Sequence, residues 1–241
     1  MSDVEHVTED WQRALAVVAH PDDMEFGAAA AVSRWTGRGK QVTYCLVTSG
    51  EAGIDGIPPA ESGPLREQEQ RAACRIVGVD DVVFLRQPDG VLEYGLPLRR
   101  LICEQVRRHR PEIVITNNFR DSWDGGGLNQ ADHVATGRAT LDAVRDAGNR
   151  WVFPEQLTDG LEPWGGVRQV WLPGSPRSAH AVDVTDTMDD GVASLEAHRA
   201  YLDGLGWEMD FAAMLREAAE EGGRRLGVRY ATTLEVLDLG W

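Results

Sequence analysis

Short apolar runs alternate with longer amphipathic segments through the first 150 residues of the chain. The short runs are rich in β-branched residues, a composition typical of strands buried on both faces of a parallel sheet. They predict strands at residues 14–19, 41–48, 82–85 and 112–116. The amphipathic segments predict helices at residues 24–38, 65–76, 98–109 and 134–147. This β-α alternation indicates right-handed crossovers in an α/β fold.

The pattern is weaker after residue 150. Apolar runs predict strands at residues 167–172, 181–184 and 234–239, and two further helices at 187–203 and 208–221. We find no internal repeat and no low-complexity linker. The chain is therefore predicted to form one domain over residues 1–241, with a Rossmann-like, doubly wound, mostly parallel sheet and a C-terminal extension.

Two glycine-rich segments, residues 50–63 and 117–131, are longer than ordinary connectors. Loops of this length inside a compact α/β domain are usually functional or mobile. Each follows a predicted strand, and open α/β sheets bind ligands at the carboxyl ends of their strands. A functional site is therefore expected at this edge of the sheet.

Composition narrows the function classes. Hydrophobic residues make up 42% of the 241 residues, which is enough for a globular core, and 39 acidic against 24 basic residues give a net charge of −15. Such a charge repels nucleic acids and anionic membranes, so neither is expected as a partner. It attracts cations, which is compatible with a metal site.

Three cysteines have no metal-ligand or redox spacing and are expected to be buried thiols in a reducing compartment. The acidic N-terminus shows no signal peptide, and no segment approaches the roughly 20 apolar residues that span a membrane. A cytoplasmic protein is predicted.

The turn after the first predicted strand carries the most specific chemistry, the sequence His20-Pro21-Asp22-Asp23. His20 and Asp23 can face one metal ion across this turn. A catalytic zinc has three protein ligands and an open position, so a third ligand is expected from another loop. His133 is the candidate, and Asp132 would orient it or support the site from outside the ligand set.

Asp22 is then a carboxylate beside the metal that does not bind it. It is expected to take a proton from the attacking water and to return it to the departing nitrogen. Each residue also has an ordinary structural explanation. Asp22 or Asp23 could cap the following helix, and His133 could simply begin one.

Several motifs along the chain resemble those of the PIG-L/LmbE-like zinc N-deacetylases, which include N-acetylglucosaminyl deacetylases of mycothiol and bacillithiol biosynthesis. The matching residues are Ala19-His20-Pro21-Asp22-Asp23 with Glu25-Phe26-Gly27, Thr48-Ser49-Gly50-Glu51-Ala52-Gly53, Arg66-Glu67-Gln68-Glu69, Phe84-Leu85 with Pro88-Asp89-Gly90, Asp132-His133, and Gly227-Val228-Arg229-Tyr230-Ala231. The resemblance spans nearly the whole chain.

The resemblance implies zinc as the cofactor, with iron(II) or another divalent ion left open. By position it implies His20, Asp23 and His133 as ligands and Asp22 as the general base. It also implies that two further residues, Arg66 and Asp89, contact the sugar or polyol part of the substrate. The structural alternatives are an ion pair of Arg66 with Glu69 or Asp124, and a Pro-Asp-Gly turn at Asp89.

The chain departs from the family at two positions. Gln130 stands where many members have a histidine, and Leu128 lies near the place of a tyrosine. Glutamine donates a hydrogen bond but does not act as an acid near neutral pH, so Asp22 is expected to serve as both base and acid. His180 and His198 are the other candidate acids. Trp123, in the second glycine-rich loop, is a candidate for stacking on a sugar face.

These observations predict a hydrolase that removes an acetyl or similar small acyl group from the amide nitrogen of an amino-sugar conjugate through a metal-activated water. One alternative is an amidase for a larger amide, such as a thiol conjugate. A second is a metal-binding protein without catalysis. A nucleotide-binding module is disfavoured, because the carboxylates of the first turn would repel a pyrophosphate. The expected partner is a small molecule, and a homo-oligomer is left open.

Overall fold

A single eight-stranded sheet organises the computed structural model, which describes residues 4–206 and 208–240. The strand order is β1-β7-β8-β6-β5-β2-β3-β4. Every neighbouring pair is parallel except those made by β8, which runs antiparallel to β6 and β7. The strands are β1 (Glu5–His6), β2 (Arg13–Val18), β3 (Gln41–Leu46), β4 (Asp81–Phe84), β5 (Ile113–Thr116), β6 (Gln169–Pro173), β7 (His180–Asp183) and β8 (Ala231–Asp238). The prediction of a mostly parallel α/β sheet is confirmed.

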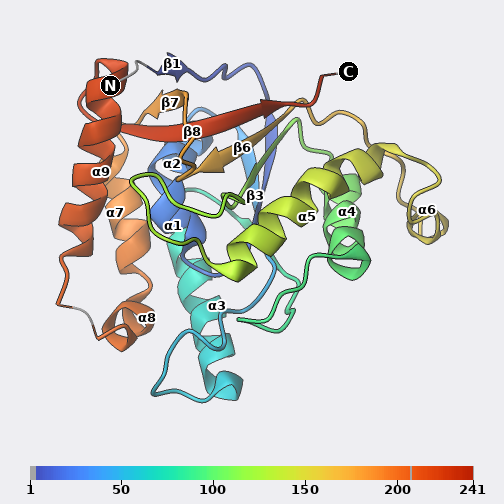
Figure 1. Cartoon of the computed structure of the whole chain (residues 1–241), viewed down its shortest axis with the longest axis horizontal. Helices are drawn as coiled ribbons and strands as arrows, with labels where there is room; N and C mark the ends of the chain where they lie inside the picture. The colour runs from blue at the N-terminus through green and yellow to red at the C-terminus, as the bar shows by residue number, and fades with distance from the viewer. Residues whose placement is uncertain (1–3, 207, 241) are drawn as a thin grey trace.

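Helices cover both faces of this sheet (Figure 1). Those found in the described ranges are α1 (Asp23–Gly27), α2 (Ala29–Gly37), α3 (Pro59–Ile76), α4 (Leu96–His109), α5 (Ala131–Gly148), α6 (Glu155–Thr158), α7 (Met188–Glu196), α8 (Arg199–Gly204) and α9 (Phe211–Leu226). Among the residues described, no helix combines the length and apolar character needed to cross a membrane.

Strand β2 is apolar at nearly every position because both of its faces are buried. Ala14, Ala16 and Val18 pack into the cluster that includes α2 and α7, whereas Leu15 and Val17 pack into the cluster on α4 and α5. Successive side chains of a strand point to opposite faces, and here both faces are covered. The continuous apolar run therefore reflects a central parallel strand.

Two predicted helices are divided in the structure. The helix expected at 24–38 breaks at Ala28, whose φ of −150° is not helical, and α1 and α2 lie on either side. The helix expected at 187–203 becomes α7 and α8, with buried His198 at the start of α8. The first break lies against another part of the chain, because Pro173 lies 3.2 Å from the position that a Cβ on Gly27 would occupy. Two short elements, β1 and α6, were not predicted.

The topological switch point of the sheet lies between β2 and β5. From β2 the chain continues outward through β3 and β4, then returns to pair β5 on the other side of β2. The carboxyl ends of β2 and β5 therefore flank the crevice where doubly wound folds bind their ligands. His20 follows β2, and His133 lies in the first turn of α5, after the loop that leaves β5.

Candidate active site

Hydrogen bonds tie together the ends of the central strands and thereby hold the first turn in place. The backbone N–H of Ala19 donates to Oδ1 of Asn117 at 2.7 Å, and the hydroxyl of Thr48 donates to the carbonyl of Ala19 at 2.9 Å. Within the turn, the N–H of His20 donates to Oδ2 of Asp23 at 2.8 Å. The turn therefore projects from a rigid junction of β2, β3 and β5.

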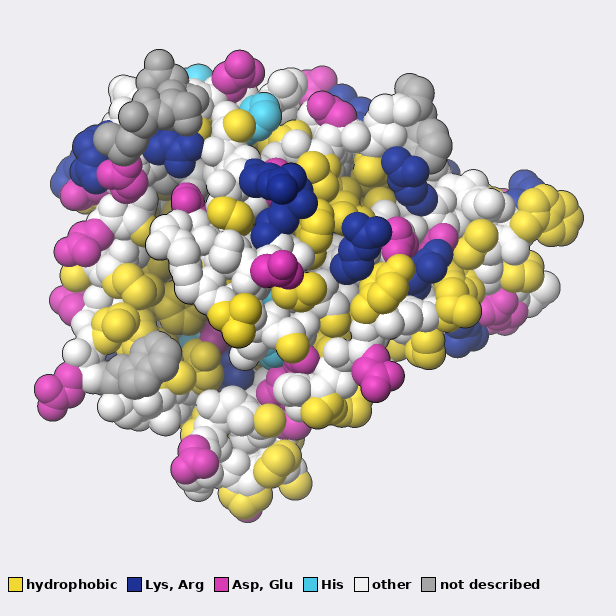
Figure 2. Space-filling view, in the orientation of Figure 1, with side chains coloured by type: hydrophobic (Ala, Val, Ile, Leu, Met, Phe, Trp, Pro, Cys, Tyr) yellow, Lys and Arg dark blue, Asp and Glu magenta, His cyan; other side chains and the backbone are white. Residues whose placement is uncertain are grey.

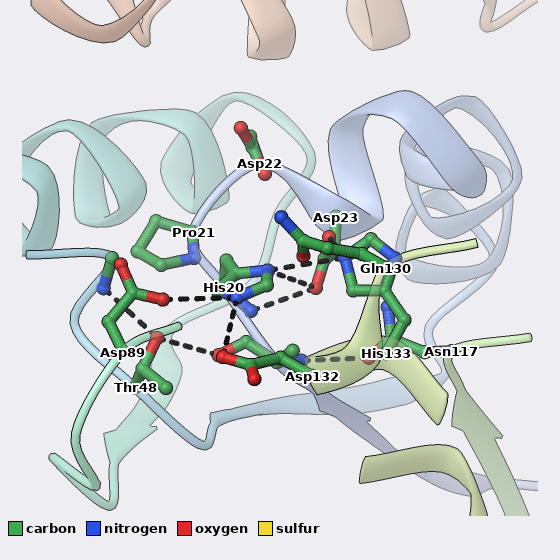
Figure 3. A network of polar contacts seen from close by, with 12 residues as sticks. His20, Pro21, Asp22, Asp23, Thr48, Asp89, Asn117, Gln130, Asp132 and His133 are labelled. Carbon is green, nitrogen blue, oxygen red and sulfur yellow. Dashed lines mark hydrogen bonds and ion pairs between the residues drawn. The ribbon is translucent and has the colours of Figure 1, made fainter. Parts of the chain in front are cut away.

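Three side chains from the two predicted motifs meet beside this turn (Figure 3). Nδ1 of His20 lies 3.2 Å from Nε2 of His133, and that Nε2 atom lies 2.9 Å from Oδ1 of Asp23. Nδ1 of His20 lies 3.7 Å from the other carboxylate oxygen of Asp23, Oδ2. The structure thus brings together the three residues predicted as metal ligands, although His20 and His133 lie 113 positions apart.

These spacings fit one divalent cation. Zinc bonds of about 2.0–2.1 Å in a tetrahedron place neighbouring donor atoms roughly 3.3 Å apart. In each histidine, the ring nitrogen that points away from the shared position has an oxygen partner. Nδ1 of His133 lies 3.2 Å from Oδ1 of Asn129, and Nε2 of His20 lies 3.1 Å from Oδ1 of Asp89. An N–H at each outer nitrogen leaves the lone pairs of both inner nitrogens directed at the shared position, as metal-bound histidines require.

Carboxylates surround the outer edge of His20. Nε2 of this ring lies 3.1 Å from Oδ1 of Asp89 and 3.4 Å from Oδ2 of Asp132. Burial opposes protonation of His20, but these two carboxylates and Asp23 outweigh it and raise its pKa well above 6.5 when no cation is bound. The site therefore carries a strong negative field that favours a cation.

Asp132 faces His20 instead of its neighbour His133. Of the two roles expected for Asp132, this geometry does not fit the orienting of His133, whereas it fits support of the site from outside the ligand set. Consecutive residues of a helix point about 100° apart, so the two side chains leave α5 in different directions. Asp132 also accepts from the N–H groups of Gly90 at 2.7 Å and Leu92 at 3.0 Å. It thus connects the loop after β4 to His20, while Asn129 supports His133.

Asp22 projects away from the three candidate ligands (Figure 3) and is 5% exposed. Its φ of 96° is left-handed, a strained conformation that is rare outside glycine and is often found at functional sites. Its N–H donates to Oε1 of Gln70 at 3.0 Å, and its Oδ2 accepts from Nη2 of Arg66 at 3.1 Å. Burial raises the pKa of Asp22 to about 6 against the opposing charge of Arg66.

Arg66 is 2% exposed, and its charge is used within the protein. Its guanidinium donates to the carbonyls of Pro21 and Gly50 and lies 3.9 Å from the ring centroid of Tyr201. Gly50 has a φ of 63°, and a Cβ there would lie 2.4 Å from Nη1 of Arg66. The glycines of this loop therefore leave room for Arg66, which pairs with Asp22 instead of with Glu69 or Asp124.

Asp89 likewise has partners within the chain. Its Oδ1 faces His20, and its Oδ2 accepts from the N–H of Ala52 at 2.8 Å. Arg66 and Asp89 both line the cavity described below, as expected for substrate contacts. Their geometry also indicates a positioning role for each residue, because Arg66 orients Asp22 and Asp89 orients His20.

Behind Asp22 lies a buried polar group that the sequence did not reveal. Glu25 is 3% exposed and accepts from Nε2 of Gln70 at 3.0 Å, and its Oε2 lies 3.5 Å from Nε2 of the fully buried His198. Burial opposes protonation of His198, but Glu25 raises its pKa above 6.5. Glu25 was visible only as a member of the first motif. Its link to a histidine 173 residues later depends on the placement of α8.

The remaining sequence candidates divide between the cavity and the rest of the molecule. Gln130 and Trp123 line the cavity, and the Trp123 ring packs edge-on against His133 with 5.3 Å between centroids. Leu128 is 87% exposed and lies outside the cavity lining. His180 lies in β7, and neither it nor His198 lines the cavity, so neither reaches a substrate there as an acid.

A cavity of about 1000 Å³ opens over the candidate metal position. One half is polar and carries the residues described above. The other half is lined mainly by apolar side chains of α1, α7 and α9, and α9 also contributes Glu221 and Arg225 to the cavity lining. Figure 2 shows hydrophobic side chains around a hollow beside α9. Ligand sites of small molecules generally occupy about 300–1000 Å³, so this one is large.

A sequence profile described as PIG-L, GlcNAc-PI de-N-acetylase, matches residues 15–144, just over half of the 241-residue chain. The chain belongs to the PIG-L family. The matched segment contains all three candidate ligands and Asp22. The resemblance inferred from the sequence motifs is thereby confirmed.

Relatives from other organisms extend the similarity to most of the chain. A diacetylchitobiose deacetylase of Thermococcus kodakarensis is 28% identical over 224 residues, which cover 92% of this chain and 82% of that protein. A 1D-myo-inositol 2-acetamido-2-deoxy-α-D-glucopyranoside deacetylase of Streptomyces avermitilis is 27% identical over 258 residues, covering 87% of this chain and 83% of the relative. Both relatives are deacetylases of amino-sugar compounds by name.

The fold is also shared with a solved structure. The N,N'-diacetylchitobiose deacetylase of Pyrococcus horikoshii superposes with a TM-score of 0.87 at 23% sequence identity, covering 95% of this chain and 85% of that chain. The architecture of the PIG-L protein described here is therefore that of a known deacetylase.

Proposed function

We propose that this PIG-L protein is a metal-dependent hydrolase that removes an acetyl or small acyl group from the amide nitrogen of an amino-sugar conjugate. The observation that carries the proposal is the combination of three convergent donors, His20, Asp23 and His133, with a buried carboxylate, Asp22, that is not among them. A purely structural metal site has no use for such a carboxylate beside a cavity. The names of the amino-sugar relatives supply the substrate class.

Zinc is the proposed ion, and iron(II) or another divalent cation would suit the same donors. When bound, the cation supplies a Lewis acid that activates water and stabilises negative charge on the amide oxygen. Asp89 and Asp132 keep the ring of His20 oriented for this task through its Nε2 atom. Asn129 has the same effect on His133.

Asp22 is proposed to accept the proton of the attacking water and to pass it to the amine as that nitrogen departs. A carboxyl group with a pKa of about 6 is well matched to holding and returning a proton near neutral pH. Two hydrogen bonds hold Asp22 in place, one from Arg66 to its carboxylate and one from its own backbone N–H to Gln70. Gln130, which lines the cavity, is proposed to donate a hydrogen bond to the substrate oxygen.

A second candidate function is hydrolysis of a larger amide, such as a thiol conjugate. The size of the cavity favours it, since about 1000 Å³ exceeds what an N-acetylated monosaccharide requires. Both candidates use the same reacting residues and differ only in the group that fills the cavity.

An amine-release screen tests the proposal. The purified protein, loaded with zinc, is offered N-acetylated sugars, inositol conjugates and thiol conjugates, and free amine is measured. We expect release from at least one amino-sugar conjugate and its loss in Asp22→Asn with metal content unchanged. Full metal content with no amine release across the panel would instead support a metal-binding protein without catalysis.

The proposed cellular setting rests on the chemistry of the cysteines. Three buried cysteines, Cys45, Cys74 and Cys103, are free thiols, which supports a reducing, cytoplasmic location. One continuous sheet from β1 to β4 supports the proposal of one domain. The proposed partner is the small-molecule substrate.

A further inference from the structure

The cavity extends beyond the candidate metal position into an apolar half that the proposed reaction does not use. Phe26 of α1, Met188 of α7, and Phe211, Met214 and Leu215 of α9 line it. The rings of Phe26 and Phe211 meet edge to face, with 6.1 Å between their centroids. We refer to these five residues, together with Met209 at the mouth, as the apolar half.

The apolar half is suited to a hydrocarbon ligand. Phenyl rings and methionine side chains offer no strong partner for sugar hydroxyls, and leaving hydroxyl groups there without hydrogen bonds would be costly. Methionine is flexible and polarisable, so it adapts to chains of different shape. Phe211 and Met214 are only partly buried, although both pack on the core.

Most of this lining comes from outside the segment that the family profile matches. The profile match ends at residue 144, whereas α7 and α9 lie beyond it and only Phe26 lies inside it. Apart from Phe26, the apolar half is thus contributed by a different part of the chain from the reacting residues, although both share one continuous cavity. A ligand that reaches both must be polar at one end and apolar at the other.

We propose that the substrate carries a linear alkyl chain and that the apolar half binds it. This inference rests on the proposed function for the position of the amide at the metal. Two parts of an amino-sugar conjugate could carry the chain, namely the acyl group that is removed or the group attached to the sugar. Their shared chemistry is a run of methylene groups, each of which strengthens binding about fourfold when fully buried.

Kinetics with matched substrates tests the proposal on the zinc-loaded protein. The reference is the methyl glycoside of N-acetylglucosamine, compared below micellar concentrations with its octyl glycoside and with the methyl glycoside of N-octanoylglucosamine. We expect at least a tenfold higher kcat/KM for one of the two chain-bearing substrates, which identifies the part that carries the chain. Equal values for all three would overturn the inference and leave the proposed function standing.

Binding measurements make the result independent of turnover. Calorimetry compares octyl with methyl glucosaminide, and octanoate with acetate, which are the products of the two reactions. We expect the chain-bearing member of one pair to bind at least tenfold more tightly. That result without amine release from any substrate would support the alkyl site and reject the proposed function. Equal affinities within both pairs would reject the alkyl site.

Substitutions that introduce a negative charge into the apolar half provide the matched variants. Met209 is 46% exposed at the mouth, so Met209→Glu is tolerated by the fold, and Met214→Glu places the same charge deeper. Both are expected to reduce the advantage of the chain-bearing ligand to less than threefold. Ile76→Glu is the control, because Ile76 is 41% exposed and lies outside the cavity lining. An unchanged advantage in both cavity variants would place the chain elsewhere.

Discussion

Replacing Asp22 with asparagine is expected to make the metal-free protein more stable while it strongly slows catalysis. Asp22 is 5% exposed, and burial raises its pKa from 3.8 to about 6. An asparagine at position 22 is neutral, as a protonated Asp22 is. The raised pKa already includes the favourable ion pair of ionised Asp22 with Arg66. Because the pKa is raised in spite of that pair, ionised Asp22 destabilises the folded protein relative to a neutral side chain.

The magnitude follows from the shift. Each pKa unit corresponds to about 1.4 kcal/mol, so a shift of roughly two units gives an upper bound of about 3 kcal/mol. Because the folded-state pKa of this acid is raised, wild-type stability falls as pH rises from about 4 to about 6 and is constant above that range. The advantage of the variant is therefore absent near pH 4 and complete above pH 7.

Thermal unfolding in the presence of a chelator at pH 8 measures this advantage. A gain of 3 kcal/mol corresponds to an increase in Tm of roughly 6–12 °C for a chain of this size. Asp55→Asn is the control, because Asp55 is exposed and its replacement changes the net charge equally. Added zinc should reduce the difference, since a nearby cation favours ionised Asp22.

The same variant is expected to lose roughly 10²–10⁴-fold in kcat, the usual contribution of a general base. In the wild type, kcat/KM should fall as pH drops below about 6, where Asp22 becomes protonated, and bound metal moves this limb to lower pH. A lower Tm for Asp22→Asn in chelator would refute the stability argument and show that the ion pair with Arg66 dominates. Retained turnover would refute the assignment of the base.

Three further substitutions test the site. His133→Ala should remove most of the roughly one bound metal ion per chain expected of a three-ligand site, measured by elemental analysis, whereas His180→Ala, outside the cavity, should keep it. Asp132→Asn should weaken metal affinity about 10–100-fold in a chelator competition, because His20 loses a carboxylate partner, and unchanged affinity would contradict that orienting role. Gly50→Ala should lower the free energy of unfolding by at least about 1–2 kcal/mol in urea titrations, because a left-handed φ and the close Arg66 both oppose a Cβ, and wild-type stability would show that Arg66 moves aside.

Much of the fold was accessible from periodicity. Strand β2 is covered on both faces, so its residues are apolar without alternation, and its helices show the amphipathic pattern of a covering layer. Predicted boundaries differ from the observed ones by a few residues for most elements. The divided helices were missed, because local propensity contains no information about Pro173 or Glu25, the groups that lie against the breaks.

The sequence by itself predicted where the candidate metal site lies. His20 and Asp23 lie within one turn, and His133 begins a helix after another strand, so strand order alone brings them to one edge of a parallel sheet. Local chain geometry and one topological rule are enough for that inference.

Only the tertiary structure decided how these groups are supported and what the rest of the cavity accepts. The facing of Asp132 toward His20, the burial of Arg66 against Asp22, and the apolar half depend on contacts between segments many tens of residues apart. Such contacts are set by helix phase and by the packing of α7, α8 and α9 against the sheet. No local pattern encodes these quantities, because each requires the position of a second element.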